Sequence, residues 1–243
     1  MKVVAIVQAR LGSTRLPRKA LAPLNERILL AHVMERAHAI RGVSEVVLTM
    51  PLTDSDLESE HWRQLVQAEG RADGIGMPTS HFSHLPVEDV LGRFAYVAEV
   101  FRADVIMRLT GDCPLLDPGI CAETLGLFFA SGADFASNDT LRSGYPDGTD
   151  CQVFTRALLE RAHLDATDPA DREHVCPWMI RQPDVKQVML RSAVDYSALK
   201  LSVDDASDLA RVRAIYQHLT PGDFSLTATI RAAIVAGIYQ GAV

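Results

Sequence analysis

Residues 3–20 read VVAIVQARLGSTRLPRKA, a strand-like run that opens into a basic loop. The run VVAIV contains only small or β-branched apolar residues, which is typical of a buried strand. The loop crowds cationic side chains around Gly12: Arg10, Arg15, Arg18 and Lys19. A tight loop with glycine exposes backbone N–H groups that, together with arginine and lysine, can hold a polyphosphate. The alternative is a solvated basic loop, and the stretch matches neither G-x-x-x-x-G-K-[ST] nor G-x-G-x-x-G.

Outward from this strand, strand-like and helix-like segments alternate along the chain. Strands are expected at residues 3–7, 45–50, 104–110 and 133–137, and helices at residues 30–37, 56–69, 88–102, 118–131, 155–164, 171–181, 205–218 and 225–240. This alternation predicts an α/β fold with a mostly parallel sheet and helices on both faces. Turn residues crowd 138–155, which predicts an excursion from the sheet. We expect a single domain over residues 1–243, because no repeat or linker interrupts the pattern.

The composition excludes several classes of protein. The chain has 243 residues, 48% of them hydrophobic, and a formal net charge of −7. A negative protein of this kind is not expected to bind nucleic acid or an anionic membrane, since both need a basic surface. The four cysteines show no zinc-like spacing, which indicates free thiols in a reducing compartment. Without a signal peptide or an apolar run long enough to span a bilayer, a cytoplasmic location is expected.

Two further loops place aspartates where strands end. RLTGDCPLLDP (108–118) puts Asp112 beside Gly111, and LSVDDASDL (201–209) puts Asp204 after a short expected strand. Ligands of such sheets bind at the carboxyl ends of the strands, and carboxylate oxygens suit Mg²⁺. The alternatives are a simple turn aspartate at position 112 and a helix cap at Asp205 or nearby. Asp117 is expected to cap the helix that begins with Pro118.

Taken together, these motifs resemble a known family. QARLGSTRLPRKAL (8–21), DVLGRF (89–94), RLTGDCPLLDP, SND (137–139), YPDGTD (145–150), DREHVCPW (171–178) and SVDDASDL (202–209) stand in the order and spacing of the spore-coat polysaccharide biosynthesis cytidylyltransferases. That family is related to the CMP-sialic acid and CMP-ketodeoxyoctulosonate synthetases. The resemblance covers nearly the whole chain, and the first two motifs are the most specific ones.

The resemblance implies a Rossmann-like nucleotidyltransferase domain of the GT-A type. It implies that CMP is transferred from CTP to a sugar acid or a related polysaccharide precursor, and that pyrophosphate is released. The residues expected to bind nucleotide are Ala9, Arg10, Leu11, Gly12, Ser13, Arg93 and Gly111, with Arg15, Lys19 and Asp112 in catalytic roles. Asp112 and Asp204 would hold Mg²⁺. For Arg93, the alternative is a surface arginine on an amphipathic helix.

The residues expected to bind the acceptor lie in the irregular segment at residues 138–180. The resemblance implies that this segment binds the acceptor or forms a homodimer arm, with Asn138, Asp147 and Asp150 as the acceptor residues. Ordinary turn chemistry is the alternative for all three, and His174 is expected to be a packing histidine.

The chain also departs from the family pattern on this side. Cys151 and Gln152 stand where an acidic residue is common, and residues 71–88 differ from the expected short strand and glycine turn. The departures affect the choice of acceptor more than the reaction.

Two other functions stay open at this point. A nucleotide-sugar-dependent glycosyltransferase can share the architecture, but it usually carries a D-x-D pair, and residues 112–114 read DCP. A non-catalytic nucleotide-binding subunit would not need both Asp112 and Asp204.

Overall fold

The computed structural model describes residues 1–51, 85–139 and 143–241. The helix expected at residues 56–69 and most of the 71–88 loop lie outside the described residues. Across the described part of the chain, no helix is both long and apolar enough to cross a membrane.

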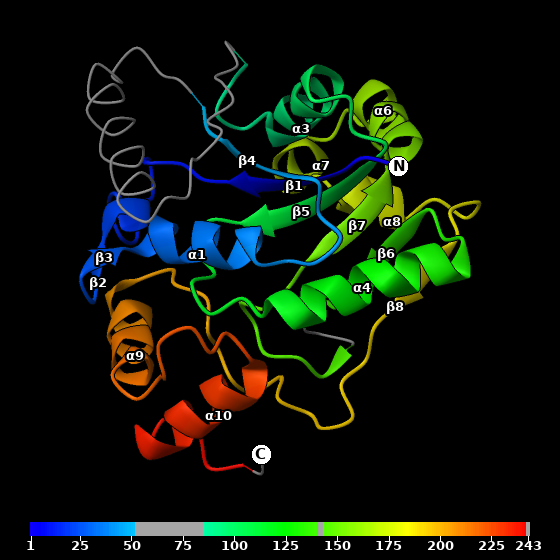
Figure 1. The fold of residues 1–243 in the computed structure, drawn as a ribbon. Coiled ribbons are helices and arrows are strands. Elements are labelled where there is room, and N and C mark those ends of the chain that lie inside the picture. The colour runs from blue at the N-terminus through cyan, green and yellow to red at the C-terminus, as the bar shows by residue number, and fades with distance from the viewer. Residues whose placement is uncertain (52–84, 140–142, 242–243) are drawn as a thin grey trace.

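The described strands form a six-stranded sheet in the order β4-β1-β5-β7-β6-β8. The strands are β1 (Val3–Gln8), β4 (Glu45–Thr49), β5 (Val105–Thr110), β6 (Phe135–Ser137), β7 (Gln152–Thr155) and β8 (Gln187–Met189). β1 pairs in parallel with β4 and β5, and β6 pairs in parallel with β8, whereas β7 is antiparallel to both β5 and β6. Figure 1 shows β7 pointing opposite to β1 and β5. The mostly parallel sheet predicted from the sequence is confirmed.

Helices cover both faces of this sheet, as predicted (Figure 1). The helices are α1 (Leu29–His38), α3 (Val90–Val100), α4 (Pro118–Ser131), α6 (Arg156–Asp165), α7 (Pro169–His174), α8 (Pro177–Ile180), α9 (Ala206–Tyr216) and α10 (Leu226–Val235). Val3, Ala5 and Val7 of β1 pack in one core with α1, α4, α9 and α10. Val4 and Ile6 pack in a second core with α3, α6 and α8. Both faces are buried, which explains why the strand reads as a continuous apolar run.

The excursion predicted at residues 138–155 is shorter than expected, because its last residues form β7. Gln152–Thr155 enters the sheet between β5 and β6. Four residues, of which Val153 and Phe154 are buried, are too few to show a strand period in the sequence. The short strands β8 and the β2–β3 ribbon (Pro23–Leu24 and Arg27–Ile28) were also not predicted.

Two other expectations were wrong. The single helix expected at residues 171–181 is broken into α7 and α8 at Val175, and Pro177, which has no N–H to donate, begins α8. Val175, between the two helices, adopts a positive φ of 70°. The short strand expected before Asp204 is replaced by irregular chain that forms one isolated bridge, between Lys200 and Asp147.

Asp117 caps α4 as predicted, and it also anchors α10. One carboxylate oxygen accepts hydrogen bonds from the N–H groups of Gly119 and Ile120, at 2.6 and 3.3 Å. The other accepts from the buried N–H of Leu226 at 2.6 Å. One side chain therefore joins the start of α4 to the start of α10.

We predict that Asp117→Ala lowers the free energy of unfolding by about 2–4 kcal/mol, as measured by urea denaturation. A lost cap costs about 1 kcal/mol, and the unpaired Leu226 N–H adds about 1–3 kcal/mol. Asp168→Ala is the matched control, because Asp168 caps α7 through one exposed bond, to Ala170 N–H. Its loss should cost only about 0.5–1 kcal/mol, and equal losses in the two variants would contradict the anchoring role.

Candidate active site

A cavity of about 260 Å³ opens where β1 and β5 end, the edge at which sheets of this type bind ligands. Most of the site residues predicted from the sequence line it: Ala9, Arg10, Ser13, Arg15, Lys19, Arg93, Gly111, Asp112 and Asp204. Leu11 and Gly12 lie in the same loop but do not line the cavity. A Cβ at Gly12 would meet nothing within 4 Å, so the space beside it is open.

Lys19 joins the two aspartates predicted to bind metal. Its Nζ donates to Asp112 Oδ2 at 2.7 Å, lies 3.3 Å from Asp204 Oδ1, and donates to the Val203 carbonyl at 2.8 Å. The Lys19 side chain is only 15% exposed. Arg15 adds a second cation, because its Nη2 lies 3.0 Å from Asp204 Oδ1. The fold thus gathers two acids and two cations from three distant segments.

A second layer of contacts holds Asp204 in place. Lys200 Nζ lies 3.0 Å from Asp204 Oδ2 and 2.6 Å from Asp208 Oδ2, and the Asp204 N–H donates to Asp208 at 3.0 Å. Although partial burial opposes its ionisation, hydrogen bonds from Lys200 and Lys19 lower the pKa of Asp204. Asp205 caps α9 through the N–H groups of Ser207 and Asp208. The cap and the site carboxylate are therefore neighbouring residues with different tasks.

Backbone contacts bring the aspartate loops together. The Val203 N–H donates to the Asp112 carbonyl at 2.9 Å, and the Leu201 N–H donates to the Asp147 carbonyl at 2.7 Å. Gly111 lets the ends of β1 and β5 meet, because its N–H donates to Gln8 O at 2.8 Å. A Cβ at Gly111 would lie 2.8 Å from that same oxygen. Larger residues at position 111 would push the two strand ends apart.

Arg93 is buried rather than on the surface, so the surface alternative is wrong. It is 3% exposed, and its guanidinium donates to the carbonyls of Pro86 and Val87, each at 2.8 Å. Burial lowers the pKa of Arg93. The side chain lines the cavity from α3 while fixing the chain before that helix.

The three residues expected on the acceptor side do not line the cavity. Asn138 is fully buried, donates to Thr149 O at 2.8 Å and accepts from Cys151 N–H at 2.7 Å. Asn138 thus holds the two ends of the excursion together. Both ends of its amide are already bonded within the protein, so they are not free to contact an acceptor. Asp147 accepts from the Ser202 hydroxyl at 2.9 Å, and burial raises the pKa of its carboxyl. Asp150 accepts a long bond, 3.5 Å, from the Gly148 N–H in its own turn.

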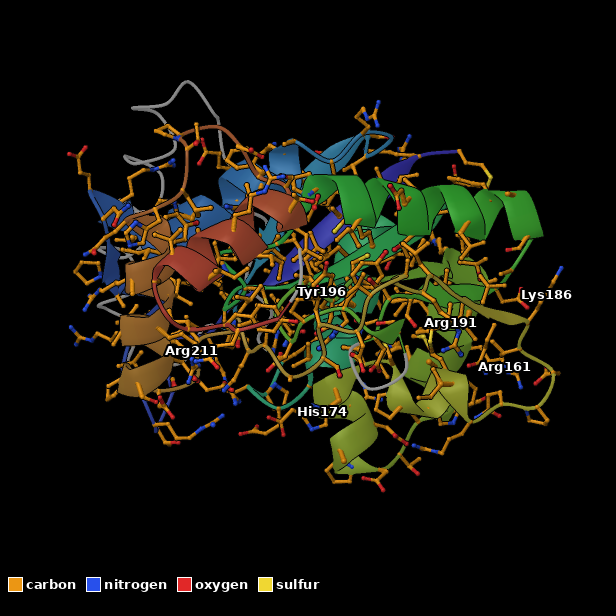
Figure 2. The ribbon with its side chains drawn as sticks, turned by 90° about the horizontal axis from the view of Figure 1, so that it is seen from below. Arg161, His174, Lys186, Arg191, Tyr196 and Arg211 are labelled. Carbon is orange, nitrogen blue, oxygen red and sulfur yellow. The ribbon has the colours of Figure 1, made fainter. Side chains whose placement is uncertain are left out.

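The cavity also contains residues that were not predicted to bind ligand. Gln8, Arg108, Thr110, Glu173 and His174 line it. His174, the last residue of α7, is exposed (Figure 2), so its interpretation as a packing histidine was wrong. Arg108 could have been found, because a charged residue inside the apolar strand DVIMRLT needs a partner or a role. Arg10 reaches Glu173 at 3.3 Å and so connects the basic loop to α7.

The cysteines and acids of the described residues do not gather into a metal centre. All four cysteines are free and buried, as expected for structural thiols. Within residues 1–51, 85–139 and 143–241, no three His, Cys, Asp or Glu side chains gather as a metal site would require. Asp112 and Asp204 line the cavity from two loops, and Glu173 lines it from α7.

Gly148 generates a prediction about how the two loops meet. It adopts a φ of 98°, and a Cβ there would overlap the backbone nitrogen of Ser202 and lie 2.7 Å from the Leu201 carbonyl carbon. Gly148→Ala should therefore lower the free energy of unfolding by about 3 kcal/mol or more. Gly126→Ala, in the middle of α4 with open space around it, should instead raise it by about 0.5–1 kcal/mol. Urea denaturation measures the free energy of unfolding of both variants. An unchanged free energy of unfolding in Gly148→Ala would show that the two loops need not approach so closely.

Asp208 generates a prediction about pH. Its side chain is 4% exposed, and hydrogen bonds from Lys200 and Arg211 outweigh burial and lower its pKa from 3.8 to about 2. The folded state thus favours the ionised form. The stabilisation is complete above about pH 4 and is lost as pH falls toward 2, an effect of about 2 kcal/mol.

Asp208→Asn tests this dependence in buffer without divalent cations. The difference in unfolding free energy between wild type and variant should be largest above pH 4 and should shrink as the pH is lowered. Asp165→Asn is the control, because Asp165 is exposed at the end of α6. A wild-type-to-variant difference that stays constant between pH 5 and 3 would contradict the lowered pKa.

Comparisons with known proteins agree with this geometry. A family described as cytidylyltransferase matches residues 4–198. The spore coat polysaccharide biosynthesis protein SpsF of Bacillus subtilis is 28% identical over 219 residues, covering 88% of this chain and 86% of that protein. A 3-deoxy-manno-octulosonate cytidylyltransferase of Anaeromyxobacter dehalogenans is 31% identical over 187 residues, covering 71% of each protein.

Among solved structures, a cytidylyltransferase from Leptospira borgpetersenii superposes with a TM-score of 0.84 at 26% identity. The match covers 98% of this chain and 95% of that one. The family match spans most of the chain, including the basic loop, Asp112 and the excursion. The chain therefore belongs to the cytidylyltransferase family and is a nucleotidyltransferase.

Proposed function

We propose that this protein transfers CMP from CTP to a sugar acid or a related polysaccharide precursor, with Mg²⁺, and releases pyrophosphate. The observation that carries the proposal is the Lys19 ammonium between Asp112 and Asp204, at the wall of a cavity beside the basic loop. The names of the relatives support the acceptor class, since one acts on 3-deoxy-manno-octulosonate and another belongs to spore coat polysaccharide biosynthesis.

The basic loop supplies the charge that a triphosphate needs. Arg10, Arg15 and Lys19 all line the cavity, and in this structure each contacts a carboxylate. Arginine can form forked contacts with phosphate oxygens, and lysine acts as a mobile point charge. A bound triphosphate would therefore exchange contacts with the carboxylates for contacts with phosphate oxygens.

The acidic pair fits a hard divalent cation. Asp112 and Asp204 contact the same ammonium from two loops, and their donors are carboxylate oxygens. Mg²⁺ prefers such donors, commonly keeps several waters and takes only one or two protein carboxylates together with substrate phosphates. Bound there, Mg²⁺ would neutralise charge on the phosphates. The two aspartates would hold it, with Lys200 and Asp208 positioning Asp204.

The reaction needs positioning more than covalent help from the protein. A hydroxyl oxygen of the acceptor attacks the α-phosphorus of CTP and forms the new O–P bond. The bond from the α-phosphorus to the bridging oxygen breaks, and pyrophosphate leaves with that electron pair. The hydroxyl proton passes to bulk water, so no general base among the side chains is required.

Neither of the other two functions has an observation in its favour. Pro114 stands two residues after Asp112, where the second acid of a D-x-D pair would be. A non-catalytic subunit would leave the contacts around Asp204 unexplained. The homodimer through residues 138–180 and the cytoplasmic location stay predictions.

The proposal is tested by thermal unfolding with CTP, UTP, ATP, GTP or dTTP, each with and without Mg²⁺. A nucleotide at a hundred times its Kd adds about 2.7 kcal/mol, which raises the Tm of a chain of this size by roughly 5–11 °C. We expect this shift for CTP with Mg²⁺. Asp112→Asn should reduce the part that depends on Mg²⁺, and Asp165→Asn, an exposed control, should not.

Pyrophosphate release with 3-deoxy-manno-octulosonate as acceptor completes the test. Release that requires CTP, Mg²⁺ and acceptor together is the expected result. Stabilisation by CTP without release for any sugar acid tried would favour the non-catalytic subunit. A Tm that no nucleotide changes would contradict the assignment of the basic loop.

A further inference from the structure

The cations that line the cavity fall into two groups. Within the described residues, Arg10, Arg15 and Lys19 each contact a carboxylate, whereas Arg93 and Arg108 contact none. Arg93 is satisfied by two backbone carbonyls. Arg108 differs from Arg93, because its hydrogen bond to a neutral side chain leaves its Nε without a partner among the described residues.

The guanidinium of Arg108 has one nitrogen that is paired and one that is buried without a partner among the described residues. It lies on β5 opposite Gln152 of β7, and its Nη1 donates to Gln152 Oε1 at 2.7 Å. Its Nε is buried and has no hydrogen-bond partner among the described residues. The edge formed by Nε and Nη2 is the one with which arginine binds two oxygens of a carboxylate or phosphate side by side. A half-buried cation with this edge unpaired is incomplete without an anion.

A second unpaired group lies on the neighbouring strand. Gln8 ends β1 and lines the same cavity, and its Oε1 is also buried with no hydrogen-bond partner in the described part of the chain. In the sheet, Arg108 pairs with Ile6, so Gln8 lies two residues further along the same face of β1. The wall therefore offers an unpaired cationic donor close to an unpaired acceptor. This pattern complements a ligand with an anionic group next to a hydroxyl.

Gln152 keeps this edge available. A glutamate has almost the same shape as glutamine, and at position 152 it would place a carboxylate against Arg108. Its charge would satisfy the guanidinium from within the protein and repel an incoming anion. The neutral amide instead fixes the orientation of Arg108 through one bond and leaves its charge for a ligand.

We propose that Arg108, oriented by Gln152, binds the anionic group of the acceptor, and that Gln8 accepts a hydrogen bond from a neighbouring hydroxyl. The proposal rests on the proposed function for the identity of the second substrate. The anion is a carboxylate or a phosphate, since arginine matches the oxygen spacing of both. Arg108 and Gln152 thereby select a charged acceptor over a neutral one.

The test compares Gln152→Glu with wild type, and Gln217→Glu is the matched control. Gln217 follows α9 on the exposed surface, so the control makes the same charge change away from the cavity. Binding is measured with Mg²⁺ and the α,β-methylene analogue of CTP, which cannot release pyrophosphate. The probes are 3-deoxy-manno-octulosonate, its methyl ester, glucose 1-phosphate and glucose.

Wild type and Gln217→Glu should bind an anionic probe more tightly than its neutral counterpart. In Gln152→Glu, the Kd of that anionic probe should rise about 10- to 100-fold, the range for a charged hydrogen bond, while the Kd of the CTP analogue stays within about threefold. Arg108→Gln should show the same loss. If the variants lose the preference for 3-deoxy-manno-octulosonate over its methyl ester, the anionic group is a carboxylate. If they lose the preference for glucose 1-phosphate over glucose, it is a phosphate.

Three results would overturn the proposal. The first is equal binding of anionic and neutral probes by wild type. The second is an unchanged acceptor Kd in Gln152→Glu, provided that its Tm shows it folded. The third is weaker binding of the CTP analogue in Arg108→Gln with the acceptor unaffected, which would assign Arg108 to the nucleotide. Anion-selective binding without pyrophosphate release from CTP would instead contradict the proposed function alone.

Discussion

The Lys19 ammonium lies between two carboxylates, and the geometry of the site depends on that contact. Asp112 comes from the end of β5, Asp204 from the chain before α9, and Lys19 from the loop after β1. Without the lysine, two acids would face each other at the wall of a half-enclosed cavity, and like charges at short range are costly. The same cation therefore stabilises the folded loops and is available to a phosphate. One side chain, Lys19, thus holds the loops together and offers a positive charge to the substrate.

Several features of the molecule could be predicted from the sequence because they rest on local chemistry. The run VVAIV, the cap at Asp117 and the apolar faces of the helices depend on neighbours within a few residues, and these predictions were confirmed. The approach of Lys19 and Asp112 followed from the rule that strand ends share an edge, whereas Asp204 reaches the same place from irregular chain. The break between α7 and α8 was missed because it lies at Val175, and a positive φ is uncommon for a β-branched residue.

What the sequence could not supply depends on contacts between distant segments. Asn138 looks like a turn residue or a ligand contact, and only the folded chain shows both ends of its amide held by Thr149 and Cys151. Arg108 and Gln152 are 44 residues apart, and their pairing requires β7 to lie beside β5. A four-residue strand has no period to reveal that neighbour. The pairing of Arg108 with Gln152 could therefore not be predicted, because the order of the strands in the sheet was not known from the sequence.

The amide of Asn138 closes the excursion at its base, so the strands on either side are insulated from what happens at its tip. The entropic cost of a longer loop grows only slowly with length, and β6 and β7 keep their register as long as this closure holds. Beyond the closure the excursion contacts the chain before Asp204, because the Leu201 N–H donates to the Asp147 carbonyl and Gly148 packs against Ser202. A change of length in this part of the excursion would therefore be felt first at the chain that leads to Asp204, while the closure at Asn138 shields the strands that carry Arg108 and Gln152.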